Sequence, residues 1–558
     1  MRIHCLVITF LFSTIYAFSD FQMYLNQLGY YPQSTKIALI PKTEITEFTI
    51  LNEDEIAVYS GKLSLAQFWD DAGDHYSLAD FSKLTTEGSY RLKVGREVTP
   101  PFTINRGAYS DVALATVKAL YFQRASTLLD PEHAGKWARA FGHPDDACVY
   151  HPSTGKNEGT RSSPGGWYDA GDYGKYTIPL AYTTYRLLSL YERYPFVFSD
   201  GTLNIPESGN GRNDLLDEMR VGLDWLHTMQ DTDGAAFHKL TSLTFEPKDV
   251  MPHQARKQRW IIGKSTKATL DYAAALAQAA RVYREIDSAF SKACIQRAER
   301  AWAWAKKNPR VHYKNPEDVR TGEYGGRAGA DEFFWAAVEL LITTQKPEYR
   351  ETVKAYDSKL NVGDAAGWNN VKMHGVFSLL QHPDALDTED WEELKDDFLN
   401  YAREIALQID HSPGRIVSSR FGWGSNGYKA YRGVALMEAF RLSGKSQYIT
   451  AAGEIADYLL GKNPLGYSFI SGFGSNPVKN IHHRLSIADG VEDLIPGLVS
   501  GGPNKGQQDR DGVDYPNSFP AKSFVDDTNS YASNEVTTYW NAEAAYLLTA
   551  LEIEHRHL

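Results

Sequence analysis

Residues 165–194 read GGWYDAGDYGKYTIPLAYTTYRLLSLYERY, a glycine-rich loop followed by a run whose apolar residues recur at helical spacing. The loop places two carboxylates, Asp169 and Asp172, three positions apart, just before the helix predicted at 176–194. The same periodicity recurs from about residue 108 onward and predicts further helices of ten to twenty residues. These are expected at 112–125, 267–284, 288–306, 332–343, 391–408, 433–442, 448–460 and 536–553.

The loops between these helices are long and rich in Gly, Asp, Trp and Tyr, and long loops inside a compact domain usually carry function. The pattern allows about twelve helices. That number predicts a mainly α protein with an (α/α)6 barrel over residues 106–558. Periodicity alone leaves an irregular helical bundle open as the alternative.

The N-terminal part of the chain has shorter, strand-like runs separated by turn signals. They predict a small β-sandwich over residues 20–105. This region carries no candidate acid, base or row of stacking aromatics, so we expect it to brace the helical domain and not to bind substrate. The strands are expected at 36–40, 47–51, 89–94 and 102–104.

The first residues have the pattern of a secretory signal. A basic start is followed by the apolar run 5–17, which is too short to span a bilayer. Residues 1–19 are therefore predicted to be a signal peptide, and the protein is expected to be secreted or periplasmic, with no membrane span. The remaining cysteines, Cys148 and Cys294, allow one disulfide, and their spacing does not decide whether it forms.

Composition excludes several classes of protein. The 558 residues are 42% hydrophobic and 23% charged, as in soluble globular proteins, and long enough for two structural units. The formal net charge of -12 argues against nucleic acid as a ligand, because phosphate backbones are held by clustered Lys and Arg. The 33 Tyr, 25 Phe and 12 Trp offer flat faces for sugar rings, although large helical cores also use Tyr and Trp heavily.

The paired acids of the glycine-rich loop are candidates for catalysis. Two carboxylates at such a turn can hold a water between them, and backbone amides at a helix start would keep both ionised, as a general base requires. Taken alone, the loop leaves two other interpretations open: Asp172 capping the helix, or a calcium-binding loop.

Glu535 lies in the segment 524–542, FVDDTNSYASNEVTTYWNA, at the predicted start of an apolar final helix. An apolar surround raises the pKa of a carboxyl and keeps the proton that a general acid needs. The alternative is an exposed glutamate in the first turn of a helix, favoured by the helix dipole.

A third segment, SFISGFGSN at 468–476, is followed by Ile481-His482-His483-Arg484. His and Arg can donate hydrogen bonds to sugar hydroxyls, and an Arg can hold a neighbouring carboxylate ionised. Two adjacent histidines also occur as a packed pair or as an incidental metal site.

Together these segments resemble glycoside hydrolase family 9. Segments 468–484 and 524–542 resemble its two signatures, and Asp169-Ala170-Gly171-Asp172 matches its base-bearing loop. Residues 135–139, 204–211, 263–266 and 422–427 also resemble the family, so the likeness covers essentially the whole mature chain. LNQLGY at 25–30 is similar to the start of the immunoglobulin-like domain that precedes the barrel in one subgroup.

The resemblance implies an (α/α)6 barrel with an open cleft, preceded by an immunoglobulin-like β-sandwich. It also implies hydrolysis with inversion, in which the two carboxyls stand roughly 6.5 to 9.5 Å apart so that a water fits. On this resemblance Asp172 is the base, Asp169 helps to position the water, and Glu535 protonates the leaving oxygen.

The resemblance also suggests supporting residues around the bond that is cut. His482 and Arg484 would grip the sugar, and Asp526 would support the acid. Tyr531 is a further candidate for binding substrate. Trp540 and Trp368 are candidates for stacking faces. His238 could reach a sugar hydroxyl, with a satisfied core histidine as the equal alternative.

One departure from the family bears on metals. Relatives in this subgroup can hold zinc with two Cys and two His, and the matching cysteine positions here are Ala125 and Gly142. Only His143 remains of the adjacent Cys-His pair, so we expect neither zinc nor any catalytic cofactor. Calcium stays open as a structural ion whose ligands the spacing does not reveal.

The leading hypothesis is a monomeric enzyme that cuts β-1,4-glucan chains internally. An exo-acting relative that releases cellobiose, glucose or glucosamine would share the catalytic residues, so only the loops at the cleft ends discriminate. A non-catalytic carbohydrate-binding protein would be free to lose Asp172 or Glu535, and both are present. The sequence does not decide which β-glucan is preferred.

Overall fold

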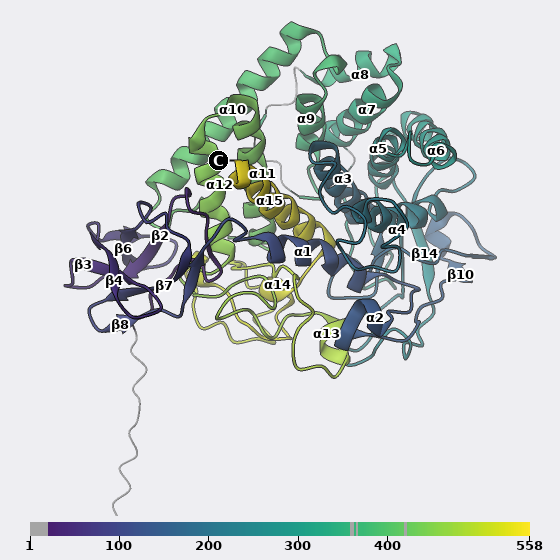
Figure 1. Ribbon diagram of the computed structural model, residues 1–558. Helices are drawn as coiled ribbons and strands as arrows, with labels where there is room; N and C mark the ends of the chain where they lie inside the picture. The colour runs from purple at the N-terminus through teal and green to yellow at the C-terminus, as the bar shows by residue number, and fades with distance from the viewer. Residues whose placement is uncertain (1–20, 328, 358–361, 364–366, 418–420, 558) are drawn as a thin grey trace, which may run out of the picture.

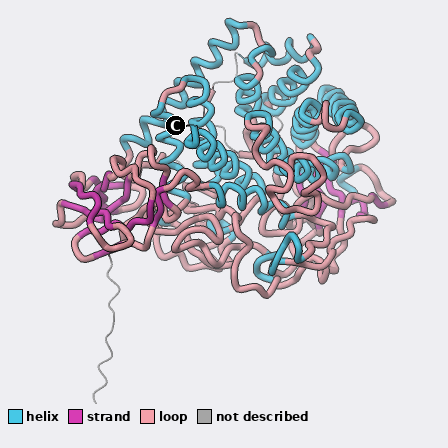
Figure 2. The backbone as a smooth tube through the Cα atoms, in the orientation of Figure 1, coloured by secondary structure: helices cyan, strands magenta, loops and turns pink. Residues whose placement is uncertain are grey.

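The computed structural model describes residues 21–327, 329–357, 362–363, 367–417 and 421–557. The predicted signal peptide at 1–19 lies outside these residues. A β-sandwich at the N-terminal end packs against a large helical domain, with a layer of long loops at one end of the helices (Figures 1 and 2).

The sandwich consists of two sheets that enclose a core of their own. Alternation along β7 places Tyr90, Leu92 and Val94 inward and their neighbours outward, as expected for a strand with one buried face. The larger sheet runs in the order β1 (Gly29–Tyr30), β9 (Phe102–Ile104), β7 (Gly88–Val94), β3 (Glu47–Leu51) and β4 (Ala57–Lys62), with β8 (Glu97–Val98) beside β7. The smaller runs β2 (Ile37–Pro41), β6 (Asp74–Asp80) and β5 (Gln67–Trp69).

Six helices form an inner ring, and each packs on the next around it. The ring closes between α9 and α11, where the two helices touch least. There the ring of Phe377 on α9 packs against that of Tyr431 on α11. These helices are buried along almost their whole length, which is why their sequences are apolar or small on nearly every face. In ring order they are α3 (Thr177–Arg193), α5 (Thr266–Val282), α7 (Ala330–Thr344), α9 (Lys372–Gln381), α11 (Ser425–Ser443) and α15 (Thr538–His557).

A second set of helices packs outside this ring, so the architecture is the predicted (α/α)6 barrel. They are α1 (Ser110–Gln123), α4 (Asp214–Thr228), α6 (Ser288–Lys307), α8 (Pro347–Asp357), α10 (Thr388–His411) and α12 (Ser446–Leu459). Short helices in the loops are α2 (Pro131–Ala134), α13 (Arg484–Ala488) and α14 (Tyr531–Asn534), with single 3-10 turns at Gly135–Trp137, Pro152–Thr154, Pro383–Ala385 and Pro520–Lys522.

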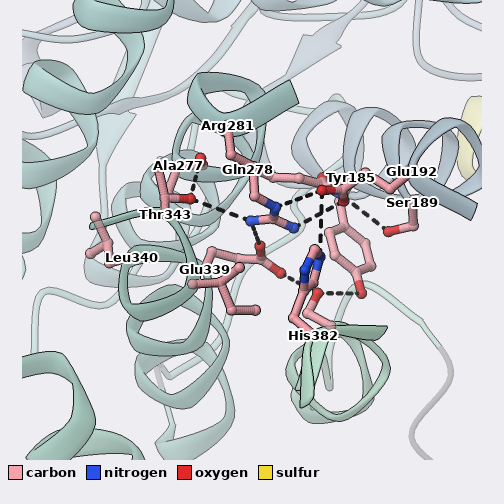
Figure 3. A network of polar contacts seen from close by, with 12 residues as sticks. Tyr185, Ser189, Glu192, Ala277, Gln278, Arg281, Glu339, Leu340, Thr343 and His382 are labelled. Carbon is pink, nitrogen blue, oxygen red and sulfur yellow. Dashed lines mark hydrogen bonds and ion pairs between the residues drawn. The ribbon is translucent and has the colours of Figure 1, made fainter. Parts of the chain in front are cut away.

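A charged network ties three neighbouring inner helices together (Figure 3). Arg281 of α5 donates to both oxygens of Glu192 on α3, at 2.6 and 3.0 Å, and also to Glu339 on α7. His382, at the end of α9, lies 3.5 Å from Glu192. The network therefore fixes how α3, α5 and α7 sit beside one another.

A small sheet lies on the loop side of the barrel and carries the end of the Asp169–Asp172 loop. Its order is β11 (Thr160–Arg161), β10 (Cys148–Tyr150), β14 (Trp260–Lys264), β13 (Phe237–Thr241) and β12 (Lys175–Tyr176). Because β12 follows the loop directly and pairs with β13, the sheet anchors the loop at its C-terminal end.

Sequence periodicity missed α4, α8 and α9 and placed the start of α11 at 433 instead of 425. Glycines explain part of this error, because they read as helix breakers. A Cβ at Gly427 would lie 2.2 Å from the Trp540 ring, and one at Gly375 would lie 2.6 Å from Phe334. These glycines permit close helix packing, and tertiary contacts outweigh their low helix propensity.

The sandwich packs closely against the barrel. Asn26 Nδ2 donates to Asp457 Oδ1 at 2.8 Å, and Tyr31 OH donates to Glu552 Oε2 at 2.7 Å, both in buried surroundings. Cys148 and Cys294 are separate buried thiols, so the one possible disulfide does not form. In the described part of the chain, no helix combines the length and the apolarity needed to cross a membrane.

Candidate active site

The Asp169–Asp172 loop is a tight turn closed by a hydrogen bond from Asp169 N to Gly174 O at 3.0 Å. Asp172 accepts from Gly174 N at 3.2 Å and from Tyr176 OH at 2.8 Å. Helix α3 begins at Thr177, and no side chain caps it. The alternative that Asp172 caps the helix is therefore wrong, and its carboxylate is oriented by Tyr176.

The side chain of Asp169 is buried and, within the described residues, accepts one hydrogen bond, from Tyr324 OH to Oδ2. Its Oδ1 has no partner within the described residues, so it can accept from a ligand or water. Burial raises the pKa of Asp169 well above its usual value and Asp172 adds to the rise, while the Tyr324 bond opposes it. The expectation that helix-start amides keep both acids ionised is thus wrong for Asp169.

Glu535 lies in an extended segment between α14 and α15, three residues before α15 begins. This segment pairs with His482, so Glu535 is not in the first turn of a helix. Burial raises the pKa of Glu535 well above its usual value, and the charges of Asp172 and Asp169 raise it further. Arg484 and the side chain of Trp423 oppose this only in part. Glu535 therefore keeps its proton in the range where a general acid needs it.

The three loops singled out in the sequence are fastened to one another. Arg484 donates to Gly171 O through its backbone N at 3.1 Å and through Nη1 at 2.8 Å. A Cβ at Gly171 would lie 2.1 Å from His482 O, so the approach of these two loops requires glycine at this position. Thr538 N donates to Asp169 O at 2.8 Å, which joins the first loop to the start of α15.

His482 has a defined tautomer. Its Nδ1 lies 2.7 Å from Thr528 O, and because a carbonyl only accepts, Nδ1 carries the hydrogen. Burial lowers the pKa of His482 to about 4, although the Thr528 bond acts in the opposite direction. Nε2 is therefore an acceptor at neutral pH, suited to a sugar hydroxyl.

These side chains line one cavity of about 950 Å³. Of the predicted site residues, the cavity wall includes Asp169, Asp172, Glu535, His482, Arg484, Trp368, Tyr531 and Trp540. The sequence reasoning missed several other aromatic residues of the wall, among them Phe245, Tyr324, Trp423 and Tyr428. Trp423 is 41% exposed, with its ring 5.6 Å from that of Tyr531, and its place in the segment 422–427 was the available signal.

Of three further predicted site residues, His238 takes the core position that was its alternative, Trp540 is not a stacking face, and Asp526 has a supporting role. His238 is fully buried, stacks on Tyr313 at 3.7 Å and contacts Glu323 O through Nε2, so it cannot reach a sugar. Trp540 is only 3% exposed because its ring packs on glycines of α11, and it forms a floor rather than a stacking face. Asp526 lies outside the cavity wall and accepts from Lys479 N, Asn480 N and Asn534 Nδ2, so it supports the chain next to Glu535.

Gly142 and His143, which the resemblance matches to zinc-ligand positions of the subgroup, have packing contacts of their own. His143 Nδ1 lies 2.8 Å from Tyr168 OH, and a Cβ at Gly142 would lie 2.4 Å from the backbone of Pro252. Within the described residues, no three or more His, Cys, Asp or Glu side chains are grouped to hold a metal ion.

Comparison with known proteins extends these findings. Residues 109–548 match the model of glycosyl hydrolase family 9, and residues 20–99 match that of the cellulase N-terminal ig-like domain. A xyloglucan-specific endo-beta-1,4-glucanase of Bacteroides ovatus is 40% identical over 95% of this chain and 93% of its own. Endoglucanase D of Acetivibrio thermocellus is 31% identical over 95% of this chain and 83% of its own.

Solved structures of family 9 enzymes share this fold. A Bacteroides ovatus family 9 structure has a TM-score of 0.89 at 38% identity, covering 96% of this chain and 99% of its own. A thermostable endoglucanase variant from Alicyclobacillus acidocaldarius has a TM-score of 0.85 at 32% identity, covering 95% and 99%. The chain therefore belongs to glycosyl hydrolase family 9 and carries the immunoglobulin-like domain of cellulases ahead of its barrel.

Proposed function

We propose that the protein is a secreted, monomeric endo-β-1,4-glucanase that hydrolyses its substrate with inversion. One observation carries this proposal: Asp172 and a protonated Glu535 line the same aromatic cavity, with Asp169 beside them. A carboxylate oriented by a tyrosine suits a general base, and a carboxyl with a raised pKa suits the acid. A non-catalytic sugar-binding protein has no use for this pair.

Within this class, we propose a decorated soluble β-1,4-glucan of the xyloglucan type as the substrate. The relative that is 40% identical is named xyloglucan-specific, and the match covers 95% of this chain and 93% of the relative. Exposed aromatic faces at Trp423, Phe245 and Tyr531 provide platforms along the cavity wall. The exo-acting alternative has support from a cellobiosidase of Acetivibrio thermocellus at only 28% identity.

The test is product analysis on tamarind xyloglucan, carboxymethylcellulose, mixed-linkage β-glucan and cello-oligosaccharides. An endo mode predicts a fast fall in viscosity relative to the reducing ends released. Slow loss of viscosity with cellobiose or glucose as the first product would favour the exo alternative. Proton NMR of the first product should show the α-anomer, and initial release of the β-anomer would contradict inversion.

The proposed chemistry needs no metal or other cofactor, because both acid and base come from the chain. Dialysis against EDTA should leave kcat unchanged. A fall in Tm after dialysis that calcium restores would reveal a structural ion. N-terminal sequencing of protein from the medium or periplasm should start near residue 20, and full-length protein retained in the cytoplasm would contradict secretion.

A further inference from the structure

The loop at 313–326 reaches both aspartates of the active site. Gly322 N donates to Tyr176 OH at 3.1 Å, and that hydroxyl donates to Asp172 Oδ2. Two residues later, Tyr324 donates to Asp169 Oδ2. The orientation of both carboxylates therefore depends on where this loop is held.

Lys239 of strand β13 holds this loop through hydrogen bonds. Lys239 Nζ donates to Gly322 O and to Asn315 Oδ1, both at 2.7 Å, so it joins the two arms of the loop. Asn315 in turn donates to Thr321 O at 2.8 Å. Lys239 also lies directly opposite Tyr176 in the pairing of β12 with β13, and neighbours across strands share one face of the sheet.

The surroundings of this lysine are unusual for a buried cation. Its side chain is fully buried, and within the described residues no carboxylate comes within ion-pair distance of Nζ. The ring centroids of Tyr313 and Tyr176 are 5.5 and 5.7 Å away. Burial lowers the pKa of Lys239 to about 7, and the more distant charges of Asp172 and Glu323 oppose this shift.

We propose that Lys239 is a positioning residue for the general base: it holds the 313–326 loop, and through Tyr176 it sets the orientation and charge environment of Asp172. This inference rests on the proposed role of Asp172. The lysine touches no substrate and acts through Gly322 and Tyr176. Lys239 is positively charged below about pH 7, and a nearby positive charge favours the ionised form of the base.

The test is Lys239→Met, which keeps the volume and removes both the charge and the donors. We expect kcat to fall about 10- to 100-fold with KM changed less than about 3-fold. The acidic limb of the kcat profile should move to higher pH by less than about one unit, because a cation near the base is lost. The loss should be equal on a polysaccharide and on an activated aryl glycoside, since the acid is untouched.

The matched control is Lys264→Met on the adjacent strand β14. Lys264, the last residue of β14, pairs with Asp231 and Asp233, and among the described residues it has no hydrogen bond to the 313–326 loop. It should keep the wild-type pH profile. An unchanged kcat and acidic limb in Lys239→Met would overturn the inference, whereas an inactive wild-type protein would overturn the proposed function instead.

If Lys239→Met does not fold, Asn315→Ala provides the second test, because Asn315 is only partly buried. It removes one acceptor of Lys239 and the donor to Thr321 O. A smaller loss of kcat in the same direction, with a retained Tm, supports the inference. A loss confined to KM would contradict it.

Discussion

Two buried carboxylates of this barrel, Glu192 and Glu535, have opposite electrostatics. Glu192 in the network of Figure 3 is held by two nitrogens of Arg281. Burial alone would raise its pKa, but Arg281 and then His382 bring it down to about 2. Glu535 is buried in the cavity wall among other acids, and its pKa rises well above its usual value.

The difference lies in where the guanidinium groups point. Arg484 is near Glu535, but its Nε and Nη1 donate to Glu246 O and Gly171 O. It fastens loops instead of neutralising the acid. A bidentate cation thus makes a carboxylate structural, whereas an arginine occupied by backbone carbonyls leaves the acid free to hold a proton.

The largest expected effect comes from the base. Asp172→Ala should lower turnover by up to about 10,000-fold while oligosaccharide binding persists, because most sugar contacts remain. Calorimetric titration with a cello-oligosaccharide and single-turnover kinetics measure the two quantities. The Tm should not fall, since the variant removes a carboxylate from an acidic cluster. Residual turnover above a tenth of wild type would show that another group is the base.

Glu535→Gln should separate substrates by leaving group. With an unactivated polysaccharide the loss should be about 1,000-fold, and with an activated aryl glycoside about 10-fold or less. A raised pKa means that the acid is protonated, and active, until the pH rises through that pKa, so the variant should lack the alkaline limb of the profile. Equal losses on both substrates would remove Glu535 as the acid.

Arg281→Met should affect stability more than chemistry. It leaves Glu192 and Glu339 buried without their cation, which costs about 3 to 5 kcal/mol in the free energy of unfolding. Urea unfolding of the variant and the wild type at pH 7 measures this loss of free energy. A double variant, Arg281→Met with Glu192→Gln, should recover part of the loss, and no recovery would show that the charge pairing is not its cause.

The same network should make stability depend on pH. The pKa of Glu192 is depressed in the folded state, so its contribution of about 3 kcal/mol is present above its unfolded pKa. It is lost as the pH falls from about 4.5 to about 2. In Arg281→Met this part of the acid dependence should be absent. An identical acid dependence in both proteins would contradict the assignment.

Asp457, at the contact between sandwich and barrel, lies between Glu192 and Glu535 in its electrostatics, and a change there should have the smallest effect on the protein. Asp457 has Lys462 at 3.3 Å and a donor in Asn26, and burial still raises its pKa to about 6. Asn26→Leu removes that donor and should lower the free energy of unfolding by about 1 to 2 kcal/mol. Thermal unfolding measures it, with kcat on β-glucan expected to stay the same. A lost kcat at unchanged Tm would mean that the sandwich acts on catalysis rather than on stability.

The sequence by itself determined the fold class and the loops that carry the chemistry. Helical periodicity and turn signals are local properties, so the strands and helices that the pattern predicted overlap elements of the structure, although most of the short strands were not predicted. The family motifs around Asp172, His482 and Glu535 were equally local. The structure brings these three segments to one cavity, as the motifs implied.

Only the tertiary structure decided which nearby residues face the cavity, and that burial raises the pKa of Asp169 as well as that of Glu535. Tyr324 reaches Asp169 across 155 positions of the sequence, and His238, which looked suited to bind sugar, turns into the core. Trp423 is 41% exposed, whereas Trp540 is only 3% exposed because its ring packs on Gly424 and Gly427. Burial and charge pairing depend on neighbours distant in sequence, and a local pattern contains no information about them.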